Sequence, residues 1–83
     1  MEILDFYADW CGPCQIMKPT IEEFGKLHPE IKITLINIDD EEELAEEYQV
    51  SNIPCLVFMK DNKEVAREVG VVPLKKIEKL IGK

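Results

Sequence analysis

Asp5-Phe6-Tyr7-Ala8-Asp9-Trp10-Cys11-Gly12-Pro13-Cys14 is the stretch of sequence that decides the fold. Residues 2–7 form a short apolar run that predicts a β-strand, and the cysteines follow directly after its end. Beyond them, apolar residues at three-to-four spacing predict one face of a helix, namely Ile16, Met17, Thr20, Ile21, Phe24 and Leu27. The β-branched run 31–38 predicts the next strand, so the chain begins with a βαβ unit.

The second half of the chain predicts a helix, a β-hairpin and a final helix. We expect Asp39 or Asp40 to cap the helix. Its inward-facing residues would be Leu44, Ala45 and Tyr48. Runs 55–59 and 64–69 read as two strands joined by a turn at 60–63. The final helix would begin at Pro73 and bury Leu74, Ile77, Leu80 and Ile81.

The order βαβαββα predicts an α/β fold with a four-stranded mixed sheet and helices on both faces. Its length favours a single domain, residues 1–83. Sites in such sheets lie beyond the carboxyl ends of the parallel strands, which is where Cys11 is expected.

Charge and composition exclude several classes of function. The formal net charge is −7, and acids crowd residues 39–47, which disfavours nucleic acid as a partner. We interpret this run as a solvated helix face, with a recognition patch as the alternative. We expect no membrane span and, with no signal sequence visible at the first residues, a cytoplasmic location.

The cysteine pair predicts redox chemistry. A helix N-terminus stabilises thiolate, so Cys11 is expected to attack, while Cys14, one turn later and less accessible, would resolve the mixed disulfide. Gly12-Pro13 adds no cation, which favours a reductant over an oxidant. The alternative is half of a zinc site, for which only Cys55 and His28 remain as further ligands. We therefore expect no metal and no organic cofactor.

The sequence resembles the thioredoxin family over nearly its whole length. The matching features are the run 5–14, Pro19 in the helix, Asn37-Ile38-Asp39, Ile53-Pro54 and Gly70. The resemblance implies a thioredoxin-like fold and a dithiol that reduces client proteins with disulfides and is recharged by a thioredoxin reductase. It also implies a cis peptide bond before Pro54 and a substrate-binding surface formed by Trp10, Gly12, Pro13, Ile53, Pro54 and Gly70.

Asp5 is unusual in an apolar strand, because a buried carboxylate is costly to ionise. In the family this position lies behind the resolving cysteine and accepts its proton, which would make Asp5 the third catalytic residue beside Cys11 and Cys14. The alternative is that Asp5 points to water near the chain end.

The sequence departs from the family pattern at three points. The typical family member has an additional strand and helix before the segment that begins here, and we therefore expect 31–38 to be an edge strand. Leu35 stands where the family often has a lysine near the buried aspartate. Cys55 stands where threonine is common, and we interpret it as a small buried residue. The alternatives are regulatory oxidation and a mixed disulfide with the active pair.

Two other functions are alternatives to the reduction of client disulfides. One is a glutaredoxin-like oxidoreductase that uses glutathione, which the short architecture favours and Gly12-Pro13 disfavours. The other is a binding module in which the thiols are incidental. In each case we expect a monomer.

Overall fold

The computed structural model describes residues 1–82 and contains the seven predicted elements in the predicted order. They are β1 (Glu2–Tyr7), α1 (Gly12–Leu27), β2 (Lys32–Asn37), α2 (Glu42–Glu47), β3 (Cys55–Lys60), β4 (Lys63–Val69) and α3 (Leu74–Leu80). The strand bounds differ from the predicted ones by one residue at most.

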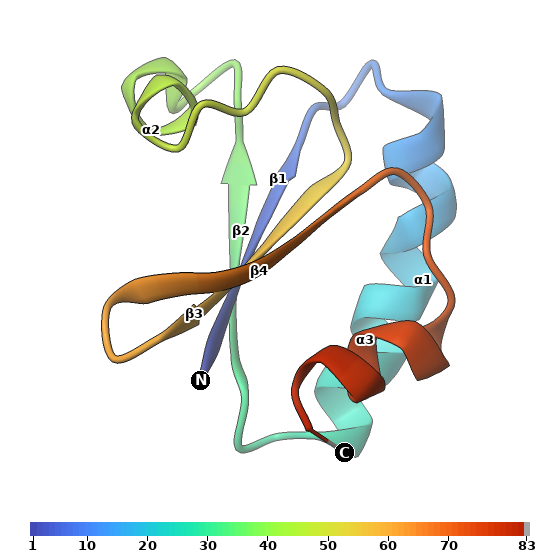
Figure 1. Cartoon of the computed structure of the whole chain (residues 1–83). Helices are drawn as coiled ribbons and strands as arrows, with labels where there is room; N and C mark the ends of the chain where they lie inside the picture. Colours follow the sequence, from blue (N-terminus) through green and yellow to red (C-terminus); the bar gives the residue numbers. More distant parts are fainter. Residues whose placement is uncertain (83) are drawn as a thin grey trace.

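The four strands form one mixed sheet in the order β2-β1-β3-β4 (Figure 1). β1 is parallel to β2 and antiparallel to β3, and β3 is antiparallel to β4. β2 is an edge strand, as expected, and its Leu35 is 60% exposed. At the tip of the hairpin, Asp61 and Asn62 adopt positive φ angles, which the tight turn between β3 and β4 requires.

Helices cover both faces of the sheet, which confirms the predicted architecture. Figure 1 shows α1 and α3 on one side of the sheet and α2 on the other. Because side chains alternate along a strand, Ile3 of β1 packs on the side of α1 and α3, and Leu4 and Phe6 pack on the side of α2. The larger core cluster, which includes Met17, Phe24, Leu56, Phe58 and Ile77, lies on the side of α1 and α3. Asp5 has the same parity as Ile3, so it faces α1.

Three details of the helices differ from the predictions, and the first is the buried face of α1. Ile16 and Leu27 are 65% and 54% exposed, because only Cys14, Met17, Ile21 and Phe24 of α1 reach the sheet. Spacing alone made the predicted face too wide.

The second helix also begins later than predicted. Neither Asp39 nor Asp40 caps α2, whose N-cap is Glu41 and has no side-chain hydrogen bond. The Asp39 carboxylate instead accepts a hydrogen bond from Trp10. At the other end of the chain, Pro73 is the N-cap of α3 rather than its first residue.

Candidate active site

The cysteine pair lies at the junction between β1 and α1, as predicted. Cys11 is the N-cap of α1 in an extended conformation, and Cys11 and Cys14 form a disulfide with their Cα atoms 5.2 Å apart. The backbone N–H of Cys14 donates to the Cys11 sulfur at 3.2 Å. Pro13 in the first turn contributes no N–H, so this amide of Cys14 is the donor aimed at the sulfur. A donor in this position stabilises a thiolate on Cys11.

The expected difference in exposure between the two cysteines is absent. In the disulfide form Cys11 is 4% exposed and Cys14 is 7% exposed. Both pack with the fully buried Ala8, and Ile53 lies against the same cluster. Any preference for Cys11 as the attacking sulfur therefore comes from the helix N-terminus and not from greater accessibility in this form.

Asp5 lies behind the disulfide on the buried face of β1. Its side chain is 8% exposed, so the alternative in which it points freely to water is wrong. Together with Cys14 it lines a pocket of about 180 Å³ between the sheet and α1. Burial raises the pKa of Asp5 from its ordinary value of 3.8 to about 6. The carboxyl group thus shares a pocket with Cys14 and has a pKa close to neutrality.

The same pocket shows what replaces the lysine that the family often has beside the aspartate. Leu35 pairs with Asp5 across β1 and β2 and lines the pocket with an uncharged side chain. Lys18 of α1 also lines the pocket and was missed by sequence reasoning. The signal for it was available, because Lys18 follows Cys14 by four residues and so shares its helix face.

Ile53 and Pro54 approach the disulfide from the segment before β3. Their peptide bond is cis, as the resemblance implied. The carbonyl of Pro54 accepts a hydrogen bond from the N–H of Gly70 at 2.8 Å, which joins the two segments. Gly70 has a φ of 94°, a conformation that favours glycine, and the space where a Cβ would stand is open.

Trp10 forms an exposed flank of the site. Its side chain is 69% exposed, and its indole N–H donates to the Asp39 carboxylate at 2.9 Å. This bond links the β1–α1 loop to the segment between β2 and α2. The resemblance implied a surface position for Trp10, whereas the residue taken alone left core packing equally open. Neither indicated Asp39 as its partner, because no spacing rule relates residues this far apart.

Cys55 is a free thiol, and neither it nor His28 belongs to the disulfide. Cys55 is 1% exposed and packs on the α2 face of the sheet, and burial raises the pKa of its thiol. His28 lies at the opposite end of α1 from Cys11, where it is the C-cap and contacts Glu78 at 2.6 Å. Within residues 1–82, no group of three or more His, Cys, Asp or Glu side chains is arranged to hold a metal ion.

Comparison with known proteins agrees with this geometry. The family model described as Thioredoxin matches residues 1–83. Thioredoxin from Chlamydia pneumoniae is 43% identical over 81 residues, which are 98% of this chain and 79% of that protein. Thioredoxin-1 from Saccharomyces cerevisiae is 39% identical over 71 residues, 86% of this chain and 69% of that protein.

Solved structures give the same result. The X-ray structure of Fasciola hepatica thioredoxin superposes with a TM-score of 0.90 at 39% identity and covers 96% of this chain and 76% of its own. The fold and the cysteine pair define a thioredoxin-fold thiol:disulfide oxidoreductase. The chain belongs to the thioredoxin family.

Proposed function

We propose that this oxidoreductase reduces disulfide bonds in client proteins, with Cys11 as the nucleophile and Cys14 as the resolving thiol. The observation that supports this most is the amide of Cys14 donating to the Cys11 sulfur at the start of α1. That donor favours a thiolate on Cys11 in the reduced protein.

The reaction would proceed in two exchanges. The Cys11 thiolate attacks one sulfur of the client disulfide, forms a mixed disulfide and releases the other client sulfur as a thiolate. Cys14 then attacks Cys11, loses its proton to Asp5 and releases the second client sulfur. The client gains a pair of electrons, and the protein is left with the disulfide between Cys11 and Cys14.

Asp5 suits the role of proton acceptor for a specific reason. It shares a pocket with Cys14, and its pKa of about 6 is closer to that of a thiol than an ordinary carboxylate's is. Trp10, Gly12, Pro13, Ile53, Pro54 and Gly70 would then form the surface that receives the client chain.

Partners and location follow from the family as proposals. A thioredoxin reductase would recharge the disulfide, which makes the protein an electron carrier, and the cytoplasm would keep it reduced. No organic cofactor or metal takes part in these steps. Among residues 1–82, no helix is long and apolar enough to cross a membrane.

Reduction of insulin disulfides tests the proposal. With dithiothreitol as electron source, the protein should accelerate insulin reduction, and Cys11→Ser should abolish the acceleration. NADPH with a thioredoxin reductase should replace dithiothreitol, whereas glutathione with its own reductase should not. Activity with glutathione alone would favour the glutaredoxin-like function, and no activity with any donor would favour a binding module.

A further inference from the structure

The end of the molecule that carries the disulfide is rich in acids, and Lys18, which lines the pocket beside Cys14, is the cation that the structure places near it. Three segments surround the disulfide, residues 8–14, 38–54 and 69–73, and none contains Lys, Arg or His. Their acids are Asp9, Asp39, Asp40, Glu41, Glu42, Glu43, Glu46 and Glu47. All are exposed, so the field they create extends into the solvent that a client must cross.

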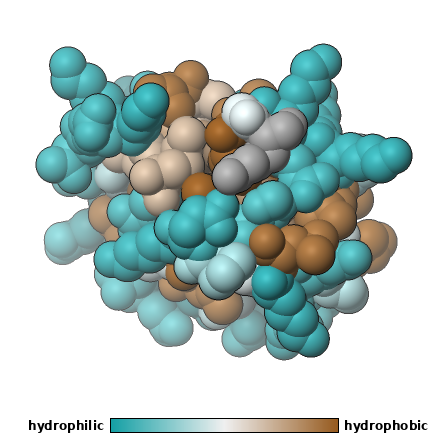
Figure 2. Space-filling view, turned by 90° about the horizontal axis from the view of Figure 1, so that it is seen from below, coloured by the Kyte–Doolittle hydropathy of each residue, from teal (hydrophilic) through white to brown (hydrophobic). Residues whose placement is uncertain are grey.

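Lysines gather at the opposite end. Lys26 is in the last turn of α1, whose first turn holds the cysteines. Lys32 lies opposite Glu2 at the start of β1, and Lys60 and Lys63 face each other at the hairpin turn. That end is seen in Figure 2, where hydrophilic side chains surround smaller hydrophobic areas. The acidic residues 39–47 and these lysines therefore lie toward opposite ends of β1 (Figure 1), and the lysines share their end with Glu2 and Asp61.

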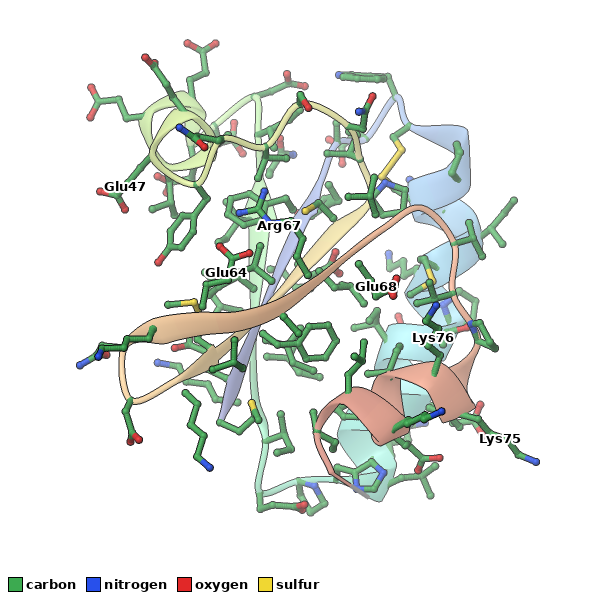
Figure 3. The ribbon with its side chains drawn as sticks, in the orientation of Figure 1. Glu47, Glu64, Arg67, Glu68, Lys75 and Lys76 are labelled. Carbon is green, nitrogen blue, oxygen red and sulfur yellow. A yellow bond between two sulfur atoms is a disulfide. The ribbon has the colours of Figure 1, made fainter. Side chains whose placement is uncertain are left out.

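In the part of the chain that the structure describes, no cation pairs with the acids of residues 40–47. Arg67 donates to Glu64 at 2.7 and 2.9 Å and to the carbonyl of Tyr48, the C-cap of α2, at 2.7 Å. In Figure 3 Glu47 projects from the outer side of α2, and Arg67 and Glu64 lie together over the sheet. Among residues 1–82 the acids from Asp40 to Glu47 take part in no ion pair, so their charge is available to a partner.

The segments around the disulfide also carry apolar side chains that a client chain can cover. Trp10 and Val71 are 69% and 51% exposed, and Ile53 packs against the cysteine cluster. We call Trp10, Ile53, Gly70 and Val71 the docking surface. The hydrogen bond from Trp10 to Asp39 attaches this surface directly to the acidic segment. A client that covers Trp10 is therefore brought next to residues 39–43.

We propose that the docking surface selects disulfide-bearing clients whose segments flanking the cystine carry Lys or Arg. The inference rests on the proposed function and names the substrate class of the same site. Cationic flanks are attracted by the acidic end and steered to the disulfide, while acidic flanks are repelled. The apolar contacts at Trp10 and Val71 then hold the client chain without regard to its charge.

Matched peptides test the inference on the full chain. We would prepare peptides with one internal disulfide and the same apolar residues beside it, with flanks of Lys, Gln or Glu, and measure kcat/KM for reduction of each. At low salt the Lys peptide should exceed the Glu peptide by about tenfold, with the Gln peptide between them. At about 0.5 M NaCl the ratio should fall to roughly twofold, because salt screens exposed charges.

Two double variants with the same net charge separate the effect of charges near the docking surface from the effect of the net charge of the protein. Asp40→Asn/Glu41→Gln removes charges beside the docking surface, and Glu23→Gln/Asp61→Asn removes the same number from α1 and the hairpin turn. The first variant should lower the Lys-to-Glu ratio about threefold, and the second should leave it near the parent value. Circular dichroism would check that both variants keep the helices.

The outcomes distinguish the two proposals. Equal kcat/KM for the three peptides, or a ratio that does not change with salt, would overturn the charge selection and leave the reductase function standing. An equal fall of the ratio in both double variants would overturn the role of the acidic segment. If no peptide were reduced, the proposed function itself would fail and the selection with it.

Discussion

Asp5 and Cys55 are two buried ionisable side chains on adjacent strands. They differ in the face of the sheet on which they lie and in the residues that surround them. Asp5 lies on β1. Cys55 lies on β3, where it pairs with Phe6, the residue that follows Asp5. Burial raises the pKa of both groups. Because alternate residues face opposite sides of a sheet, Asp5 faces α1 and Cys55 faces α2.

The surroundings of the two residues explain why only one is suited to the reaction. Asp5 lines a pocket that Cys14 also lines, which is the arrangement that the proposed proton transfer requires. Cys55 packs among apolar side chains that include Leu4, Phe6 and Val57. Burial alone therefore shows that a group is costly to ionise. The residues around the group determine whether its raised pKa can assist a reaction.

The largest effect is expected when the sulfur of Cys14, which shares the pocket with Asp5, is removed. Cys14→Ser should lower insulin turnover by about a hundredfold or more and trap Cys11 in mixed disulfides with clients, because no resolving thiol remains. Non-reducing electrophoresis after incubation with a lysate would detect the adducts. The matched control is Cys55→Thr, which removes the thiol from the other face and should leave turnover close to that of the parent. An absence of adducts while Cys11 still reacts with iodoacetamide would argue against resolution by Cys14.

Asp5→Asn sharpens the comparison by keeping the shape of the side chain and removing its ability to accept a proton. Release of the mixed disulfide should slow by about tenfold or more near neutral pH, since general base catalysis contributes at least that much. In the parent, the release rate should rise with pH through about 6 as Asp5 ionises. Stopped-flow measurement of the release step across this range would show the change. A variant that releases clients as fast as the parent, with the same pH profile, would assign the base to water or another group.

The same substitution should change stability with a definite sign. The folded pKa of Asp5 is raised from 3.8 to about 6, so the folded state holds this proton more tightly than the unfolded state. Below the ordinary pKa both states are protonated and there is no penalty. As pH rises from there to the folded pKa, the native state loses up to about 3 kcal/mol relative to the unfolded chain, and the loss is complete above the folded pKa.

Asp5→Asn should therefore raise the free energy of unfolding by about 1 to 3 kcal/mol near pH 8, and the gain should vanish near pH 4. Urea denaturation of the oxidised protein at both pH values measures it. A variant less stable than the parent near pH 8 would mean that the carboxylate forms favourable interactions that outweigh its burial.

The smallest effect is expected on the other side of the sheet. Cys55→Thr exchanges one small buried side chain for another, so the rate of disulfide reduction should stay within about twofold of the parent and stability within about 1.5 kcal/mol. The insulin assay and urea denaturation, with and without prior exposure to peroxide, would check both values. A several-fold loss of activity, or a peroxide response that disappears with the thiol, would make Cys55 part of the mechanism and remove the contrast with Asp5.

The order of elements and the position of the disulfide could be predicted from local patterns. The strand at 2–7 and the pair Cys11 and Cys14 are contiguous in sequence, so their junction follows from the end of an apolar run. The hairpin tip at Asp61 and Asn62 likewise follows from residues that tolerate positive φ. The prediction of one domain covering residues 1–83 stays a prediction.

Features that depend on distant segments could not be predicted in this way. Spacing placed Ile16 and Leu27 on the buried face of α1, but the width of the covered face depends on what the sheet and α3 offer. Asp39 was expected to cap α2, yet its carboxylate binds the Trp10 indole from another loop. Lys18 and Leu35 meet Asp5 only because α1 and β2 flank the same pocket.

The sequence by itself determined the redox pair, the βαβαββα order and the resemblance to the thioredoxin family, because each depends on short-range spacing or on contiguous motifs. Only the tertiary structure decided that Cys11 and Cys14 are both buried in the disulfide form and that Asp5 lines a pocket together with Cys14. It also decided that the acids of residues 39–47 lie toward the disulfide end of β1 and Lys32 toward the other end. Exposure, pKa and surface charge are set by which distant segments pack together, and no local pattern contains that information.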